Sequence, residues 1–203
     1  MWQGALKQLK QLSRQKNGAF TTSDVRDAGI STRTFYRMRD AGEVICISRG
    51  VYQMAETDGT SQASPDYAAI KTRVPQGIVC TISALYHHEL SVEIPRCIHL
   101  AIERNMPIPK IDYPTVRIYR MSHAPFTAGV EQMEINGVIM NIFSPEKTIA
   151  DIFKYREQFG IDLAIEGLKK YLAKPSAKAT KILQMAKICR VEKIIKPYIE
   201  AII

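Results

Sequence analysis

Apolar residues recur at helical spacing through the first 30 residues of the chain, separated by turn signals. Three leucines stand three apart among lysines and glutamines, which predicts an amphipathic helix with an exposed basic face: Leu6, Leu9 and Leu12. Asn17-Gly18 is typical of a helix end. A second short helix is predicted over residues 23–28, with Thr22 as its N-cap.

A third amphipathic helix is predicted over residues 32–41. Gly29 ends the helix before it, and Ser31 supplies the N-cap. Phe35 and Met38 stand three apart, so they share the face that is expected to point into a core. The other positions of this helix are mostly polar or basic, so we expect them to be exposed to solvent.

A β-hairpin is predicted next, from apolar runs over residues 44–47 and 51–54 with Ser48-Arg49-Gly50 between them. Three helices followed by a hairpin are the element order of a winged helix-turn-helix. The hairpin is then the wing, and Arg49 stands at its tip.

A recognition helix must offer hydrogen-bond donors near its N-terminus, where base edges and phosphates come within reach. Arg33 and Arg37 are four residues apart and share a face, so both are placed to reach one groove. Arginines also solvate many helices that bind no DNA, but the adjoining helix, turn and basic wing favour DNA binding here. The candidate DNA-binding residues are Thr32, Arg33, Thr34, Tyr36, Arg37, Ser48 and Arg49.

A polar segment without large aliphatic side chains, residues 55–64, has the composition of a linker. The sequence therefore predicts a winged helix-turn-helix domain over residues 1–56, a linker over 57–64 and a larger second domain over 65–203. Ser64-Pro65 begins that second domain as an N-cap followed by proline at the first helical position. The predicted fold class is α+β, with a mixed α/β second domain and a helical C-terminus.

The second domain carries both strand and helix patterns. Asn136-Gly137 between two extended runs of residues 130–143 is a strong hairpin signal. Ser83 is expected to cap a helix over residues 84–90. Further strands are predicted over residues 78–81, 98–103 and 116–121, and further helices over 146–159, 162–173, 176–189 and 191–203.

The composition is that of a globular protein: 203 residues, 46% of them hydrophobic, suffice for a sizeable core. A net charge of +8 favours a polyanionic partner or an anionic membrane. The N-terminal segment lacks the apolar run of a signal peptide, and no stretch reaches the roughly 20 apolar residues of a membrane span. We therefore expect a soluble, cytoplasmic protein with no membrane association.

The cysteines form no CxxC pair and are expected to be small buried residues in a reducing compartment: Cys46, Cys80, Cys97 and Cys189. His87-His88 with Glu89 does not suit a metal, because adjacent helical residues point about 100° apart. No metal site and no cofactor are therefore expected.

Pro65-Asp66 and Glu103 are similar to the acidic motif of restriction-type nucleases, but the Glu-x-Lys that such a site needs is missing, since Arg104-Asn105 follow Glu103. No phosphate-binding, nucleophile-elbow or zinc-protease motif occurs, so no enzymatic activity is expected. The last 33 residues carry a second basic surface, which suits DNA phosphate, RNA or an acidic protein, or is simply a solvated helix face: Lys174, Lys178, Lys181, Lys187, Arg190, Lys193 and Lys196.

The N-terminal pattern resembles the winged-helix domain of AbiEi-type antitoxins of type IV toxin-antitoxin systems. The resemblance rests on Gly29-Ile30-Ser31 before the recognition helix and on Arg49-Gly50-Val51-Tyr52 at the end of the wing. Residues 78–173 also resemble the antitoxin domain of that family, including the Ser-Pro-Glu-Lys-Thr-Ile-Ala-Asp segment at 144–151. The lysine-rich end of the chain has no clear counterpart.

The resemblance implies two activities. Such proteins repress their own operon by binding inverted repeats in double-stranded promoter DNA, and they counter a nucleotidyltransferase-like toxin of the AbiEii type. It also implies phage defence by abortive infection, and it does not imply direct contact with the toxin. The alternatives are a DNA-processing enzyme with a nuclease-like second domain and a one-component repressor that senses a small ligand.

Overall fold

The computed structural model describes residues 2–16, 18–55 and 64–203. These residues gather into two compact units. The first comprises Met1–Gln76, Pro109–Thr115 and Glu134–Met140, and the second comprises Gly77–Ile108, Val116–Met133 and Asn141–Ile203. Of the predicted linker at 57–64, only Ser64 falls among the described residues. The helix that follows it belongs to the first unit.

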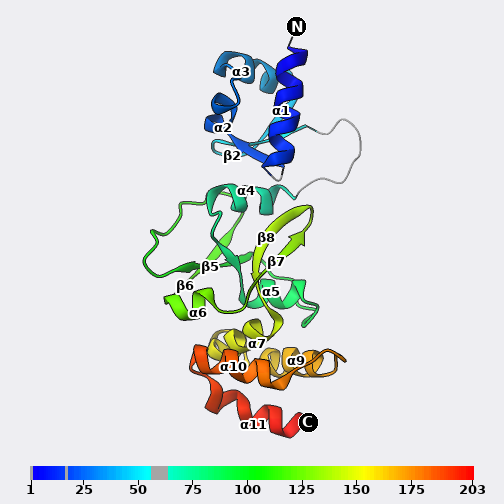
Figure 1. Cartoon of the computed structure of the whole chain (residues 1–203), viewed down its shortest axis with the longest axis vertical. Coiled ribbons are helices and arrows are strands. Elements are labelled where there is room, and N and C mark those ends of the chain that lie inside the picture. Colours follow the sequence, from blue (N-terminus) through cyan, green and yellow to red (C-terminus); the bar gives the residue numbers. More distant parts are fainter. Residues whose placement is uncertain (1, 17, 56–63) are drawn as a thin grey trace. The chain divides into compact units, whose positions relative to one another are not determined.

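The first unit contains four helices and a small antiparallel sheet within the described residues (Figure 1). The sheet has the strand order β1-β3-β2. The elements are α1 (Gln3–Gln15), β1 (Ala19–Thr21), α2 (Thr22–Asp27), α3 (Thr32–Asp40), β2 (Val44–Ser48), β3 (Val51–Met54) and α4 (Pro65–Arg73). This confirms the three N-terminal helices and the hairpin that the sequence predicts.

Local capping explains where the N-terminal helices begin. The Ser31 hydroxyl accepts a hydrogen bond from the Thr34 amide at 3.2 Å, as predicted. The cap of α2 is Thr21 and not Thr22, because Asp24 three residues later completes a capping box with Thr21. Strand β1 was not predicted, since three residues are too few to show a period of two.

The core of the first unit lies between the helices and one face of the sheet. Phe35 and Met38 are fully buried, which confirms the predicted inward face of α3. The Phe35 ring packs edge-on against Tyr52 of β3 at 4.9 Å between centroids and against Phe20 of β1 at 6.3 Å. The other buried members of this core are Leu9, Leu12, Val25, Ile30 and Val44.

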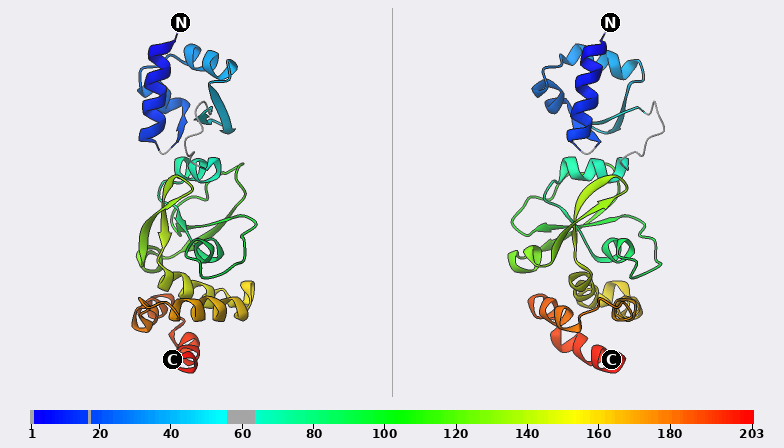
Figure 2. Two further views of the ribbon diagram at one scale, coloured as in Figure 1. Left: turned by 90° about the vertical axis from the view of Figure 1, so that its right-hand side faces the viewer. Right: turned by 45° about the vertical axis from the view of Figure 1, so that its right-hand side comes forward.

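The opposite face of the same sheet is also buried. Ala19 and Val51 alternate along their strands with the residues that face α1, α2 and α3. Both are almost completely inaccessible to solvent. Helix α4 packs against all three strands (Figure 2). Arg73 at the end of α4 donates a hydrogen bond to the backbone carbonyl of Arg49 in the β2–β3 loop. The N-terminal sheet is therefore sandwiched between helices.

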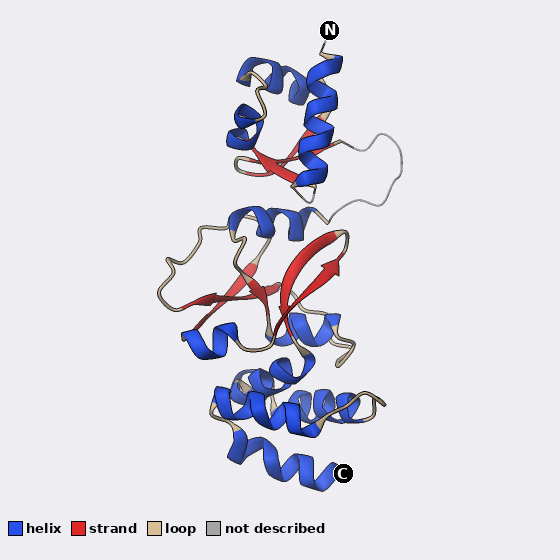
Figure 3. Cartoon of the chain, viewed as in Figure 1, coloured by secondary structure: helices blue, strands red, loops and turns tan. Residues whose placement is uncertain are grey.

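The remaining elements are built on a five-stranded mixed sheet with the order β6-β5-β4-β8-β7 (Figure 3). Strand β4 pairs antiparallel with β5 and parallel with β8, while β5 pairs parallel with β6. Asn136 and Gly137, both at positive φ, form the predicted turn between β7 and β8. The strands are β4 (Ile78–Val79), β5 (Ile98–Glu103), β6 (Val116–Met121), β7 (Val130–Ile135) and β8 (Val138–Phe143).

The helices of the second unit gather around α7. All residues from Lys147 to Phe153 are buried, so α7 is a central helix rather than an amphipathic surface helix. It packs against α5, α9, α10 and α11. The helices are α5 (Thr81–His87), α6 (His123–Thr127), α7 (Pro145–Lys154), α8 (Arg156–Phe159), α9 (Ile161–Leu172), α10 (Ala179–Cys189) and α11 (Glu192–Ile202).

Two helix predictions in this unit were wrong. The helix predicted over residues 146–159 breaks at Tyr155, whose ring packs against Tyr119 of β6 at 5.2 Å, a contact that the local sequence cannot reveal. Ser83 is not a cap but lies inside α5. Its hydroxyl accepts a hydrogen bond from the His99 amide at 3.0 Å.

The prediction that all four cysteines are buried was also wrong. Cys80 and Cys189 are buried, but Cys97 is half-buried and Cys46 is exposed. Cys46 lies on β2, which is an edge strand of the small sheet among the described residues. All four thiols are free. Within the described ranges, each helix falls short of the length and apolar content that a membrane span requires.

Candidate nucleic-acid interface

The exposed face of α3 carries three arginines in different environments. Arg39 is held in place, because its guanidinium donates twice to Asp40 at 2.7 and 3.0 Å and lies 4.7 Å above the Tyr36 ring. Arg37 lies 5.5 Å above the Trp2 ring. Within the described part of the chain, the guanidinium groups of Arg33 and Arg37 make no hydrogen bond or ion pair, and the Arg37 backbone carbonyl accepts a hydrogen bond from the Ala41 amide at 3.0 Å. Their guanidinium donors are thus available to a ligand.

Of the other candidates on α3, the side chains of Thr34 and Tyr36 make contacts within the protein, whereas that of Thr32 makes no hydrogen bond among the described residues. Thr32 is exposed in the first turn. The Thr34 hydroxyl is 2.8 Å from the Ser31 hydroxyl and so belongs to the helix cap. Tyr36 is half-buried, with its ring against Phe35 at 5.5 Å. The N-terminal turn of α3 therefore offers Thr32 and Arg33 to solvent, and Arg37 follows one turn later.

The wing candidates also differ from each other. Arg49 is exposed, and only its backbone carbonyl has a partner among the described residues, which is Arg73. Gly50 beside it has a φ of 74°, a conformation that glycine adopts without strain, so the loop turns sharply at the tip. Ser48 turns its hydroxyl inward, where it meets no hydrogen-bond partner within the described ranges. Arg49 is the side chain of the wing that is best placed for a ligand.

Sequence reasoning missed Trp2 and Arg73. Trp2 precedes α1 and contacts the end of the candidate recognition helix, and Arg73 follows the predicted linker and contacts the wing. Neither is near its partner in sequence, so no local pattern marks them. Both touch residues of the candidate interface without belonging to α3 or the hairpin.

Comparison with known families supports the resemblance that the motifs indicated. Residues 7–55 match the family model described as "Transcriptional regulator, AbiEi antitoxin". The chain has an AbiEi-type domain at its N-terminus. The match covers about a quarter of the 203 residues and includes α2, α3 and the wing in full. No curated protein sequence matches the chain.

Among solved structures, the fold is similar to the crystal structure of the RV2827C protein from Mycobacterium tuberculosis. The TM-score is 0.54 at 13% sequence identity, and the match covers 94% of this chain and 78% of that protein. At this identity the likeness concerns the fold alone. It extends the similarity beyond the AbiEi-type domain to the mixed sheet and helices that follow.

The wing of the AbiEi-type domain leads to a first prediction. Arg49→Glu is expected to weaken DNA binding more than Arg49→Ala, because a carboxylate adds repulsion from phosphates to the loss of a cationic contact. Fluorescence anisotropy with labelled duplex DNA measures both variants. Equal affinities of Arg49→Ala and Arg49→Glu would place the wing clear of the DNA.

The candidate residues for nuclease or metal chemistry are within hydrogen-bond distance of neighbouring groups. Asp66 accepts a hydrogen bond from the Tyr113 hydroxyl, and Glu103 lies 2.8 Å from Nδ1 of His123. His88 is buried, with Nε2 at 2.7 Å from the Phe143 carbonyl oxygen. Within the described residues, no three histidine, cysteine or acidic side chains gather at metal-binding distance.

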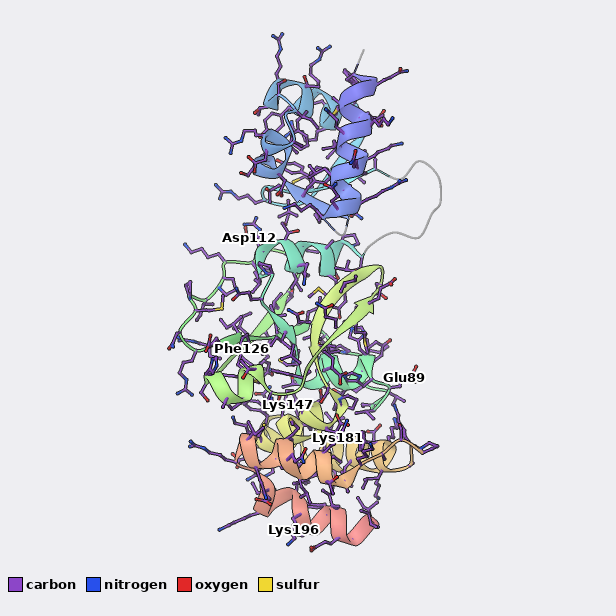
Figure 4. All side chains as sticks on the ribbon, viewed as in Figure 1. Glu89, Asp112, Phe126, Lys147, Lys181 and Lys196 are labelled. Carbon is purple, nitrogen blue, oxygen red and sulfur yellow. The ribbon has the colours of Figure 1, made fainter. Side chains whose placement is uncertain are left out.

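The lysine-rich helices α10 and α11 are partly neutralised. Lys187 pairs with Glu192 at 3.5 Å, and Lys196 pairs with Glu200 at 3.7 Å. Lys181 on α10 and Lys196 on α11 are labelled in Figure 4. Exposed cations without an ion pair among the described residues are Lys178, Lys181, Arg190 and Lys193.

A buried polar network links strands β5 and β6 of the mixed sheet to helices α5 and α8. Nδ1 of His99 is 2.8 Å from the Thr81 hydroxyl and 3.1 Å from the Tyr119 hydroxyl, which in turn accepts a hydrogen bond from Gln158 at 2.8 Å. Burial, reinforced by the charge of Arg117, lowers the pKa of His99 to about 4 from an ordinary value of 6.5. His99 is therefore neutral at pH 7.

Acid should destabilise the protein through His99. Below about pH 6.5 the unfolded chain takes up a proton on this residue, whereas the folded chain resists protonation until about pH 4. As the pH falls from about 6.5 to about 4, the free energy of unfolding should therefore decrease by about 3 kcal/mol through His99. Urea unfolding of His99→Asn across this range should give a flatter pH profile than the wild type. Parallel profiles for wild type and His99→Asn would contradict this assignment.

Proposed function

We propose that this protein is a DNA-binding transcriptional repressor of its own operon and the antitoxin of a type IV toxin-antitoxin system. The operator is double-stranded DNA with inverted repeats in its own promoter. The toxin is a nucleotidyltransferase-like protein of the AbiEii type, and the setting is phage defence by abortive infection inside the cytoplasm. The protein has no enzymatic activity in this proposal and needs no cofactor.

The observation that carries the proposal is the pair of available arginines on α3, within a domain that matches the AbiEi regulator family. An arginine guanidinium has five donors in a planar fork that suits guanine edges and phosphates. Arg33 and Arg37 stand one helical turn apart, and the exposed Arg49 stands in the adjoining wing loop. The positive net charge of +8 adds general attraction to DNA.

The two activities are assigned to different parts of the chain. Residues 1–56 bind DNA as a winged helix-turn-helix, and residues 65–203 carry the antitoxin activity. Helix α4 supports the wing from the far face of the sheet, so we expect residues 64–76 to be needed for full DNA affinity. The basic surface of α10 and α11 suits phosphate, RNA or an acidic protein equally.

The direct test uses the purified full-length protein and a labelled duplex from immediately upstream of its own coding sequence. Specific binding that survives excess unrelated DNA, together with repression of a reporter from the same promoter, supports autorepression. Cleavage of this DNA on addition of Mg²⁺ or Mn²⁺ would favour a nuclease instead. Absence of a nucleotidyltransferase-like reading frame beside the gene would favour a one-component repressor.

Antitoxicity is tested separately by co-expression with the neighbouring nucleotidyltransferase-like toxin. We expect growth to be restored by the full chain and also by a variant with Arg33 and Arg37 both changed to alanine. Failure of that variant, with the protein folded and present at wild-type level, would mean that antitoxicity depends on DNA binding.

A further inference from the structure

The N-terminal turn of α1 meets the end of α3 at one aromatic contact. Trp2 is half-buried and packs at the edge of the core formed by α1, α3 and the small sheet. Its ring lies beneath the Arg37 guanidinium, with 5.5 Å from the guanidinium carbon to the ring centroid. The Trp2 carbonyl accepts a hydrogen bond from the Leu6 amide at 2.9 Å, which fixes Trp2 to the first turn of α1.

We propose that Trp2 is a positioning residue of the DNA-binding face, which holds Arg37 in the orientation that DNA requires. This inference rests on the proposed function. A cation above an aromatic face is attracted by the ring quadrupole, and tryptophan is the strongest partner of this kind. Such a contact uses the flat face of the guanidinium and leaves the donors around its edge free.

Positioning matters because arginine is flexible. A free arginine loses rotamer freedom when it binds, and this loss reduces affinity. Because Arg37 already contacts Trp2 in the free protein, part of its rotamer freedom is lost before DNA binds. Arg33 has no such support among the described residues, so the effect should be confined to the contact that Arg37 makes.

Arg39 provides an internal comparison on the same helix. It too lies over an aromatic ring, that of Tyr36, but both of its outward hydrogen bonds go to Asp40. The stack on Tyr36 therefore holds an arginine whose charge is already paired. Trp2 instead holds an arginine whose donors are unused within the described residues, which is the arrangement expected of a binding contact.

The test compares Trp2→Leu with Trp2→Phe in the full-length protein. Leucine keeps apolar packing against the core but has no π-face, whereas phenylalanine keeps a ring. With the duplex from upstream of the coding sequence, Trp2→Leu should raise Kd about two- to five-fold, and Trp2→Phe should recover most of that loss. Thermal unfolding of each variant reports any change in folding.

A double-mutant cycle separates positioning from packing. In an Arg37→Ala background, Trp2→Leu should have no further effect on Kd, because there is no guanidinium left to hold. A merely structural Trp2 would weaken binding equally in both backgrounds, and this result would overturn the inference. A wild-type Kd for Trp2→Leu would overturn it too. If Arg37→Ala itself binds like wild type, or the wild type does not bind the duplex specifically, the proposed function fails and the inference fails with it.

The free protein offers a readout that does not involve DNA. Trp2 is the single tryptophan of the chain, so its fluorescence reports this contact alone. Arg37→Ala should uncover one face of the indole and increase quenching by acrylamide, whereas Arg39→Ala should leave it unchanged. Unchanged quenching in Arg37→Ala would show that the stack is absent in solution and would overturn the inference.

Discussion

Replacing Arg33 and Arg37 together by alanine is expected to weaken operator binding by about 2–6 kcal/mol, which is the sum of two contacts worth about 1–3 kcal/mol each. Both side chains are exposed on α3, and their donors are unused within the described residues. The measurement is a DNA titration by gel shift or anisotropy at several salt concentrations.

The salt series distinguishes two kinds of contact. If an arginine reads a base edge, its loss should relax discrimination at one operator position. If it touches phosphate only, affinity should fall uniformly across sequences and the salt slope should decrease by about 1. Arg39→Ala is the matched control, because Arg39 is already paired with Asp40. Wild-type affinity in the double variant would remove the recognition-helix assignment.

Asp151→Ala should destabilise the protein by about 3–5 kcal/mol, because it leaves the buried charge of Lys147 without a partner. Lys147 Nζ is 2.5 Å from Asp151 Oδ2, and the two side chains are 0% and 1% exposed. The remaining surroundings are weak partners for an ammonium group: the Phe143 ring at 3.9 Å and the Met121 sulfur at 4.0 Å. Urea unfolding followed by circular dichroism gives the change in stability.

Two further variants isolate the role of charge. Lys147→Met combined with Asp151→Ala should be more stable than Asp151→Ala alone, because no unpaired charge then remains in the core. Glu166→Ala is the matched control: Glu166 and Lys170 form an i,i+4 pair at 2.7 Å that is partly exposed, so its loss should change stability by less than about 1 kcal/mol. A combined variant no more stable than Asp151→Ala would show that lost packing, and not the unpaired charge, is responsible.

The N-terminal elements were readable from the sequence because their signals are local. Ser31 caps α3 through a hydrogen bond to an amide three residues away, and Phe35 and Met38 share a face by helical geometry alone. Asn136-Gly137 likewise determines a hairpin turn through its own backbone preferences. Such signals involve neighbours in the chain, so one sequence contains all the information they need.

The candidate interface could be predicted only in part from the sequence. Sequence spacing places Arg33, Arg37 and Arg49 on exposed positions, and their assignment to DNA binding stays a prediction. The tertiary structure adds which donors are unused, since Arg39 is paired with Asp40 and Thr34 belongs to the cap of α3. It also adds Trp2, which meets Arg37 because α1 and α3 contribute to the same core.

The second unit was the part of the fold that the sequence predicted least well. Lys147 and Asp151 stand four apart, a spacing that by itself indicates a solvent-exposed pair, yet they are buried because helices surround α7. The predicted helix breaks at Tyr155, whose ring packs against Tyr119, 36 positions earlier in the chain. The sequence alone determined the elements whose hydrogen bonds and apolar faces are local. Burial, pairing and helix breaks were decided by contacts between distant residues, whose energies appear only once the chain has folded.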